Sequence, residues 1–447
     1  MPVVAIPTPG LTSGRPIRLH RPLAVDMRRT LLLIPHEIAS VPLFGFGLLF
    51  ALLALAALVV SIRVVRQGGS LLDHWSRSGL IWALSAAAIV WGVPAIELTN
   101  IDGDPVGLPV RGYGVMLLLG VVAAVALAIA RGRRYGLRDE FIWGLAPWAI
   151  VGGLIGARAF YVIEYRDQFF VSDPLTTLRR IANFTEGGLV VYGSFIGGFL
   201  AGWIHVYRNR VSALTVGDVV LPTMLLGLAL GRIGCLLNGC CYGGSCQDGW
   251  AALHFPNGSP VYQDQLASGG LVGIELSADR TEVLAVRPGS PAAARGILPG
   301  QAVRHFNVVR SIESADPRRP AEETPFGLVA EIGGREHYWS ALDLPATANP
   351  VWPTQIISAI GAITLCVMLC FASRFVTLPG VILFAGAIGY AIMRFLIERL
   401  RSDEPGQFGT QLTISQWVSL IVFVVSAVSL IALAIRGQPI RPADSSA

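Results

Sequence analysis

Two short stretches place polar side chains inside apolar sequence in a pattern that favours phosphate binding. In residues 231–243, Arg232 follows a long apolar run and is itself followed by Asn238 and Gly243. A charged side chain in an apolar helix is costly unless it meets an opposite charge. Because the guanidinium fork matches the oxygens of a phosphate, Arg232 is a candidate anion ligand. Asn238 and the glycines after it indicate an unwound helix end that faces a ligand.

The second stretch carries Tyr390, Arg394 and Glu398 at intervals of four residues. In a helix this spacing puts the three side chains on one face. An ordinary Arg–Glu pair within the helix is the simpler interpretation of Arg394 and Glu398. A tyrosine in line with them, inside an apolar run, favours a polar, ligand-facing surface instead.

Two further stretches are weaker when taken alone. Arg111 and Tyr113 open an apolar run, and they could simply anchor a helix end at the membrane interface. Gly187, Gly188 and Tyr192 belong to a glycine-rich run that lets backbones approach each other or a ligand closely. Taken together, the four stretches predict one polar cavity at the outer ends of the helices.

The composition is that of a membrane protein, which explains why these polar groups stand out. Hydrophobic residues make up 53% of the chain and charged residues 14%, whereas soluble proteins carry about 25% charged residues. About 20 apolar residues cross the hydrocarbon core as a helix. We therefore predict an all-α polytopic membrane protein with about nine spans, at 43–65, 79–97, 113–131, 141–163, 187–206, 217–238, 352–373, 378–399 and 415–436.

Arginines predict the orientation of these spans. The sequence contains no lysine, and the net charge of +5 comes from arginines in short runs between apolar segments. That pattern is typical of cytoplasmic loops rather than of nucleic-acid binding. The loops after the first, third, fifth, seventh and ninth spans are the arginine-rich ones, so the polar stretches above lie on the outer side.

Residues 265–347 break the membrane pattern and predict a small soluble β-rich domain inserted in an outer loop. The run 286–300 resembles the V-x-P-G-S-P-A core of PDZ domains, and 271–274 occupies the place of their carboxylate-binding loop. PDZ domains bind extended peptides by strand addition, so a peptide partner is a hypothesis here. The alternative is a β domain that only caps the membrane part.

In their order along the chain, the polar stretches resemble those of the prolipoprotein diacylglyceryl transferase family. The resemblance rests on 111–116, 187–197, 231–243, 353–355, and 390–403 with 416–419. It implies transfer of the diacylglyceryl group of phosphatidylglycerol to the lipobox cysteine of a preprolipoprotein, with release of glycerol phosphate. It also implies a multi-pass protein of the bacterial inner membrane whose site faces the periplasm, with no cofactor and no nucleic-acid partner.

The resemblance assigns roles to the candidate residues. Arg232 and Arg394 would bind the phosphate, and Glu398 would orient Arg394 or contact the glycerol hydroxyls. The substrate-binding candidates are Arg111, Tyr113, Gly187, Gly188, Asn238, Tyr390 and Gly243. Many members carry histidine where this chain has Tyr192, and glutamate where it has Cys240. Tyr192 is the candidate base, although an ordinary tyrosine pKa near 10 makes it a poor one; the base could also lie elsewhere, or the phosphate could take the proton.

Four cysteines crowd one stretch and leave several interpretations open. Cys240 or Cys241 could pair with Cys246 in a disulfide. A metal site formed with Cys235 is conceivable, but no nearby histidine supports it, so we predict packing rather than a metal. A nucleophilic cysteine is no better supported, because the substrate brings its own thiol.

The predicted organisation follows from these assignments. It comprises a tail at 1–30, two additional spans at 31–107, the transferase-like core at 108–264 and 348–436, the insertion at 265–347, and a cytoplasmic tail at 437–447. A transporter is disfavoured because its site would lie at the membrane midplane. The remaining alternative is a non-catalytic or lipid-binding relative whose insertion binds peptides.

Overall fold

The computed structural model describes residues 29–170, 173–183, 188, 190–247, 249, 251–311, 316, 320–401, 406–407 and 409–436. Within these residues, eight helices are long and apolar enough to cross a membrane. The run at 187–206 forms the helix α7 (Val191–Arg208), which lies along a spanning helix. The predicted polytopic helical fold is therefore confirmed.

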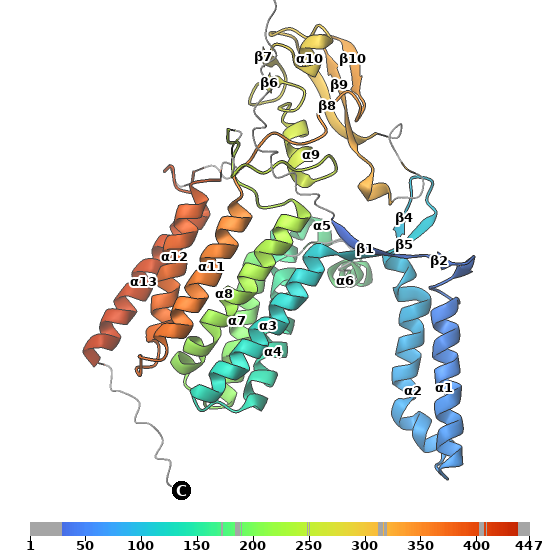
Figure 1. Cartoon of the computed structure of the whole chain (residues 1–447), viewed down its shortest axis with the longest axis vertical. Coiled ribbons are helices and arrows are strands. Elements are labelled where there is room, and N and C mark those ends of the chain that lie inside the picture. Colours follow the sequence, from blue (N-terminus) through green and yellow to red (C-terminus); the bar gives the residue numbers. More distant parts are fainter. Residues whose placement is uncertain are drawn as a thin grey trace, which may run out of the picture.

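Among the described residues, seven long helices pack together as the main body of the molecule (Figure 1). They are α3 (Gly112–Arg134), α4 (Asp139–Glu164), α7, α8 (Ala213–Asn238), α11 (Thr354–Ala372), α12 (Val381–Glu398) and α13 (Ile414–Arg436). α8 is central, because it packs against α3, α11 and α12, while α7 packs on α4 and α13 on α12. Two short helices, α5 (Arg166–Phe169) and α6 (Pro174–Ala182), lie between α4 and α7 in the chain.

Glycines bring α4 and α7 into backbone contact. A Cβ atom at Gly156 would lie 2.3 Å from the carbonyl oxygen of Gly193, and one at Gly197 would lie 2.2 Å from that of Gly152. Small residues allow this approach between membrane helices. Much of the glycine content of the 187–198 run is thus explained by helix packing.

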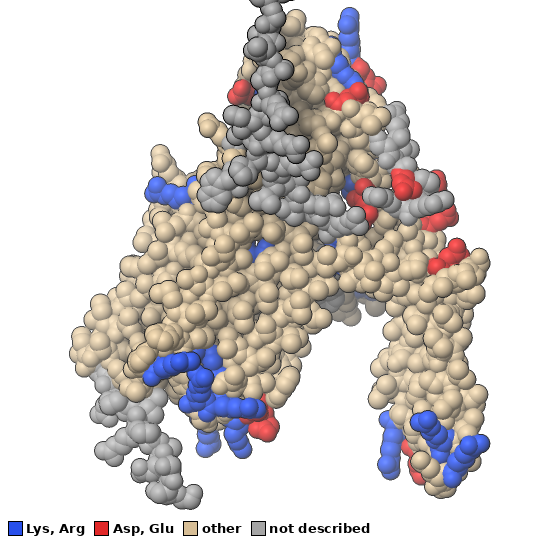
Figure 2. All heavy atoms as spheres, viewed as in Figure 1, with Lys and Arg blue, Asp and Glu red and all other residues tan. Residues whose placement is uncertain are grey.

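Charged side chains distinguish the two ends of the helices. Arginines gather at the lower end in Figure 2, where α3 finishes with Arg131, Arg133 and Arg134. The opposite end carries the soluble domain. This distribution agrees with the loop arginines from which the orientation was predicted.

An N-terminal hairpin of helices stands apart from the main body in Figure 1. It consists of α1 (Leu48–Arg66) and α2 (Leu71–Ala87), which continues through η1 (Ala88–Gly92) and η2 (Pro94–Ile96). The predicted start of this second span at residue 79 is wrong. The helix begins after its N-cap Ser70, and the polar Asp73, His74 and Arg77 in its first turns lower the hydropathy there.

Small sheets cover the end of the molecule that carries the soluble domain. β1 (Thr30–Pro35) and β4 (Leu98–Thr99) flank β5 (Pro105–Arg111), which leads directly into α3. β2 (Glu37–Ile38) pairs with β3 (Val41–Pro42). Residues 1–28 and 437–447 of the predicted tails lie outside the described residues.

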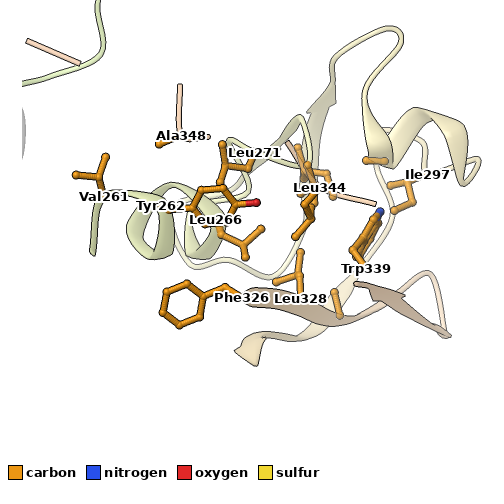
Figure 3. Close-up of a cluster of buried hydrophobic side chains, with 14 of the residues drawn as sticks. Val261, Tyr262, Leu266, Leu271, Ile297, Phe326, Leu328, Trp339, Leu344 and Ala348 are labelled. Carbon is orange, nitrogen blue, oxygen red and sulfur yellow. The ribbon is translucent and has the colours of Figure 1, made fainter. Parts of the chain in front are cut away.

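The insertion is a small domain with its own apolar core, part of which is shown in Figure 3. Its elements are α9 (Pro260–Ala267), β6 (Ile274–Leu276), β7 (Val283–Val286), α10 (Pro291–Ala294), β8 (Val303–Arg310), η4 (Ala321–Glu323), β9 (Phe326–Ile332) and β10 (Arg335–Trp339). β8, β9 and β10 form an antiparallel sheet, and β6 pairs with β7. The core extends from Leu253 to Val351, beyond the predicted limits of 265 and 347. Its outer parts show no strand alternation from which they could be predicted.

The turn that ends α8 requires a glycine. Gly239 has a φ of +72°, its N–H donates to the Leu236 carbonyl (3.1 Å), and the Cys240 N–H donates to the Cys235 carbonyl (3.1 Å). This pair of bonds is a Schellman motif, in which a left-handed residue caps the last carbonyls of a helix. A Cβ at Gly239 would also lie 3.2 Å from Phe255 and Ser259.

We predict that Gly239→Ala destabilises the protein by about 1–2 kcal/mol, because alanine is strained in the left-handed region. Gly231→Ala is the matched control, since a Cβ there would meet nothing within 4 Å. Thermal unfolding of the detergent-solubilised protein measures both variants. Equal midpoints for the two variants would contradict the assigned role of the turn.

Candidate active site

The first and third polar stretches meet where α3 begins and α8 ends. A Cβ at Gly234 would lie 3.1 Å from the ring of Tyr113, and one at Gly112 would lie 3.0 Å from the Leu237 side chain. The absence of side chains at these glycines lets the two helix ends pack closely. Tyr113 therefore lies against the helix that carries Arg232 and Asn238.

The loop after α8 is fixed by α11 and by the segment after α12. The Thr354 hydroxyl donates to the Cys241 carbonyl, and the Gln355 amide donates to the Cys240 carbonyl, each at 2.8 Å. The Gly243 N–H donates to the Trp352 carbonyl (3.0 Å), and a Cβ at Gly243 would lie 2.6 Å from Trp352. Gly243 thus serves close packing in this structure.

Arg394 and Glu398 form the ion pair that their spacing suggests. The Arg394 Nη1 lies 2.7 Å from the Glu398 Oε2, and the side chain of Glu398 is fully buried. The Thr413 hydroxyl donates to the Glu398 Oε1 (3.2 Å), and Arg394 donates to the Ser415 hydroxyl (2.9 Å). The start of α13 therefore completes the surroundings of both side chains.

Arg232 differs from Arg394 in having no protein partner. It is half-buried, and within the described part of the chain its guanidinium has neither a hydrogen-bond acceptor nor an ion-pair partner. Asn238 lies six residues further along, at the end of α8. A cation without a carboxylate at the end of a membrane span is suited to bind an anion.

The other predicted site residues are not joined to this group by described contacts. Tyr390 packs against an apolar cluster that includes Cys366 and Leu369. Tyr192 is about half exposed on α7, and no hydrogen bond or ring contact of the described residues links it to Arg232 or Arg394. Its role as a base stays a prediction.

Arg158 is a buried residue that lies outside the stretches carrying the family resemblance. Its guanidinium donates to the carbonyls of Arg180, Ile181, Asn183 and Gly188, at 2.7–3.1 Å. Gly188 has a φ of +79°, and a Cβ there would lie 2.7 Å from Arg158. Arg158 thus fixes the approach to α7; the neighbouring Gly187 lies outside the described residues. An arginine within the apolar run 141–163 was the available signal.

Arg111 connects the membrane part to the insertion. Its Nη2 lies 2.7 Å from the Glu322 carboxylate in η4, and both side chains are more than 40% exposed. Arg29 and Arg310 lie in the same region. Burial lowers the pKa of the Arg29 guanidinium, an effect that Glu322 offsets and Arg111 reinforces. Burial also lowers the pKa of Arg310. An exposed pair of this kind orients the two parts but adds little stability.

Three of the four clustered cysteines come together. The sulfur atoms of Cys235, Cys240 and Cys241 lie within 4.8 Å of one another. Cys246 is not part of this group, and the structure shows no disulfide between any of the six cysteines, all of which are described. The disulfide with Cys246 is therefore not formed here.

The fold and this arrangement define a class of protein: a multi-pass helical membrane protein that carries arginine, asparagine and glutamate at one end of its spans. A family model described as prolipoprotein diacylglyceryl transferase matches residues 105–432. The chain belongs to the prolipoprotein diacylglyceryl transferase family.

Individual relatives agree with the family match. A phosphatidylglycerol–prolipoprotein diacylglyceryl transferase of Rhodopirellula baltica is 42% identical, over 90% of this chain and 89% of the relative. The residues outside the predicted insertion at 265–347 make up less than 90% of this chain. The similarity therefore includes part of the insertion. Enzymes of the same name from Clostridium tetani (36% identity; 31% of this chain, 53% of the relative) and Idiomarina loihiensis (33%; 42% and 70%) match shorter segments.

We predict that Glu398→Ala destabilises the protein by about 3 kcal/mol, because it leaves Arg394 without its partner. This value is at the low end for breaking a buried ion pair, since 19% of the Arg394 side chain is exposed to solvent. The double variant Arg394→Ala/Glu398→Ala should recover part of this loss, since no charge is then left unpaired. Asp139→Ala, which breaks the exposed pair with Arg133, is the control and should cost less than about 1 kcal/mol. Denaturant unfolding measures all three, and a double variant less stable than Glu398→Ala would refute the pairing argument.

Proposed function

We propose that this protein transfers the diacylglyceryl group of phosphatidylglycerol to the cysteine thiol of a prolipoprotein. The observation that carries the proposal is the pair of arginines at one end of the spans: Arg232, which lacks a protein partner, and Arg394, which is held by Glu398. The family and the R. baltica relative, whose name states this reaction, support it.

The reaction needs a nucleophile and a stabilised leaving group. The sulfur of the substrate cysteine forms a bond to the glyceryl carbon, and the bond from that carbon to the phosphate oxygen breaks. Glycerol phosphate leaves with the electron pair, and the thiol proton passes to a base or to the phosphate. Negative charge therefore develops on the phosphate, where Arg232 and Arg394 would stabilise it.

Glu398 acts through Arg394 in this scheme. Its buried carboxylate holds the Nη1 edge of the guanidinium, and the Ser415 hydroxyl holds another nitrogen. The guanidinium is thereby pre-oriented, which reduces the reorganisation needed when the phosphate charge develops. Tyr113 and Asn238 lie at the adjoining helix ends and would contact the lipid headgroup or the peptide.

We infer that the protein resides in the inner membrane of a bacterium with this site on the periplasmic side. The arginine-rich helix ends would then face the cytoplasm. The soluble domain and the candidate site share the opposite side, where preprolipoproteins emerge.

The proposal is tested by complementation of a bacterium depleted of its own transferase. The wild-type chain should restore lipidation of a model preprolipoprotein, and Arg394→Ala should lower the rate by about 100-fold or more, the typical effect of losing one preorganised charge partner. Arg399→Ala is the matched control, because Arg399 is an exposed arginine on the next turn and should leave lipidation unchanged. A well-expressed, membrane-inserted wild-type chain that lipidates nothing would refute the proposed function.

A peptide partner at the insertion is the second part of the proposal. A cavity of about 180 Å³ lies beside β6 and is lined by Gly270, Gly273, Ile274, Glu275, Ala285, Val286 and Arg287. β6 pairs with β7 and with no other strand among the described residues, so its second edge can accept an extended peptide. The N–H groups of Leu271 and Ile274 already donate to backbone carbonyls, so they are not available to bind a terminal carboxylate. This favours binding of an internal segment of a peptide over binding of its C-terminus.

We predict that Ala285→Trp, which fills this cavity, weakens binding of an extended lipobox peptide. Leu284→Trp is the control, because adjacent strand residues point to opposite faces and Leu284 does not line the cavity. Crosslinking of a photoreactive peptide to the full chain measures both variants. Equal crosslinking yields would exclude peptide binding at this cavity.

A further inference from the structure

The thiols of Cys235, Cys240 and Cys241 form the one group of three or more potential metal ligands among the described residues. Their sulfur atoms lie within 4.8 Å of one another, and the three residues are half-buried. The Cys240 thiol donates to the Cys235 carbonyl (3.8 Å). The group lies at the end of α8, three residues after Arg232 and next to Asn238, within the candidate active site.

The fold brings these thiols together through the helix cap. In a Schellman motif, the residue after the left-handed glycine contacts the residue four positions before that glycine. Here those residues are Cys240 and Cys235, joined by the 3.1 Å bond from the Cys240 N–H to the Cys235 carbonyl. Two thiols of the group are therefore adjacent because of backbone geometry, not because of any attraction between sulfur atoms.

The third thiol is placed by a strained backbone. Cys241 has a φ of +58°, which is uncommon for a residue with a side chain. Such strain costs about 1–3 kcal/mol and persists only where neighbouring structure imposes it. Thr354 and Gln355 impose it here by binding the carbonyls of Cys241 and Cys240. The backbone that carries Cys240 and Cys241 is therefore fixed by α11.

The donor set fits one metal in particular. Zinc binds thiolates at about 2.3 Å in a tetrahedron, so its sulfur ligands stand about 3.8 Å apart. Three sulfur atoms within 4.8 Å of one another reach that arrangement with small movements. Structural zinc sites use four protein ligands, whereas catalytic sites use three and leave one position open. Cys246 stands outside the group, which leaves the fourth position open.

We propose that Cys235, Cys240 and Cys241 bind a zinc ion whose fourth position takes the thiol of the substrate cysteine. The inference rests on the proposed transfer reaction, which needs a thiolate near the phosphate. Among the described residues at this end of the helices, Arg232, Arg394 and Asn238 cannot act as a base at neutral pH, and the Glu398 carboxylate is held in its ion pair with Arg394. A thiol coordinated to zinc loses its proton outright, so the metal would supply the thiolate without a side-chain base.

The step balances without any oxidant or reductant. The substrate thiol replaces a zinc-bound water and gives its proton to solvent, and the resulting zinc-bound thiolate attacks the glyceryl carbon. The carbon–sulfur bond forms as the carbon–oxygen bond breaks, and glycerol phosphate leaves with the electron pair. The thioether is a weak ligand and dissociates, so water returns and zinc remains unchanged. Arg232, one turn before Cys235, offsets the negative charge of the thiolates.

Metal content of the full-length chain tests the site. The protein, purified in detergent under reducing conditions and supplied with Zn²⁺, should retain about one zinc per chain after dialysis. Cys240→Ser and Cys241→Ser should each lose it. Cys246→Ser should keep it. Loss of zinc in Cys246→Ser would indicate a closed four-cysteine site and overturn the open position, and absence of zinc in the wild-type chain would overturn the site itself.

Cobalt substitution tests the fourth ligand without relying on activity. Co²⁺ in the site should give thiolate-to-metal charge-transfer absorption, and a lipobox peptide should increase and shift it, whereas the same peptide with serine in place of cysteine should not. An unchanged spectrum with the cysteine peptide would refute substrate coordination. Full transfer activity in zinc-free protein would refute the inference while leaving the proposed function intact; zinc and peptide binding without any transfer would refute the function instead.

Discussion

The turn that ends α8 is held from several directions, and the candidate site depends on it. The left-handed Gly239 reverses the chain, and α11 binds the two carbonyls that follow through Thr354 and Gln355. Gly243 then packs on Trp352, and the Gly244 N–H donates to the Leu400 carbonyl. Segments more than 150 residues apart in the sequence thereby meet within one loop, with the insertion emerging between them.

Arginines within or beside the spans fall into two kinds, and the distinction separates structure from function. Arg131 donates to the Asp218 carbonyl and to Ser373, and Arg158 donates to four carbonyls. Protein acceptors therefore bind both guanidinium groups, although the Nε of Arg131 is buried without a partner. Arg232 finds no such acceptor among the described residues, and Arg394 is oriented by a buried carboxylate. Buried polar groups in proteins are normally satisfied, so a cation without an acceptor at this end indicates a ligand with negative charge.

Local patterns predicted most of the fold, because apolar length and loop arginines are properties of single segments. The Arg394–Glu398 pair was likewise readable from one helical repeat. The start of α2 was not, since Asp73 and Arg77 resemble a loop until Ser70 is recognised as a cap. Contacts between distant segments could not be predicted from the sequence either. No residue near Glu398 indicates Thr413 as its partner, and no residue near Arg111 indicates Glu322. The contact between Cys235 and Cys240 could have been predicted from Gly239, which lies between them and ends the helix. The position of Cys241 could not, because it depends on hydrogen bonds from α11.

Measurement of the reaction on purified protein tests the central claim most directly. The wild-type chain would be placed in lipid nanodiscs containing phosphatidylglycerol and given a lipobox peptide, and the peptide mass would be followed. The account predicts a mass gain of one diacylglyceryl group on the cysteine, with glycerol phosphate released in equal amount. Neither product should form in nanodiscs of phosphatidylcholine alone, or with serine in place of the peptide cysteine. An unmodified cysteine in the phosphatidylglycerol nanodiscs, with the protein folded and inserted, would contradict the account.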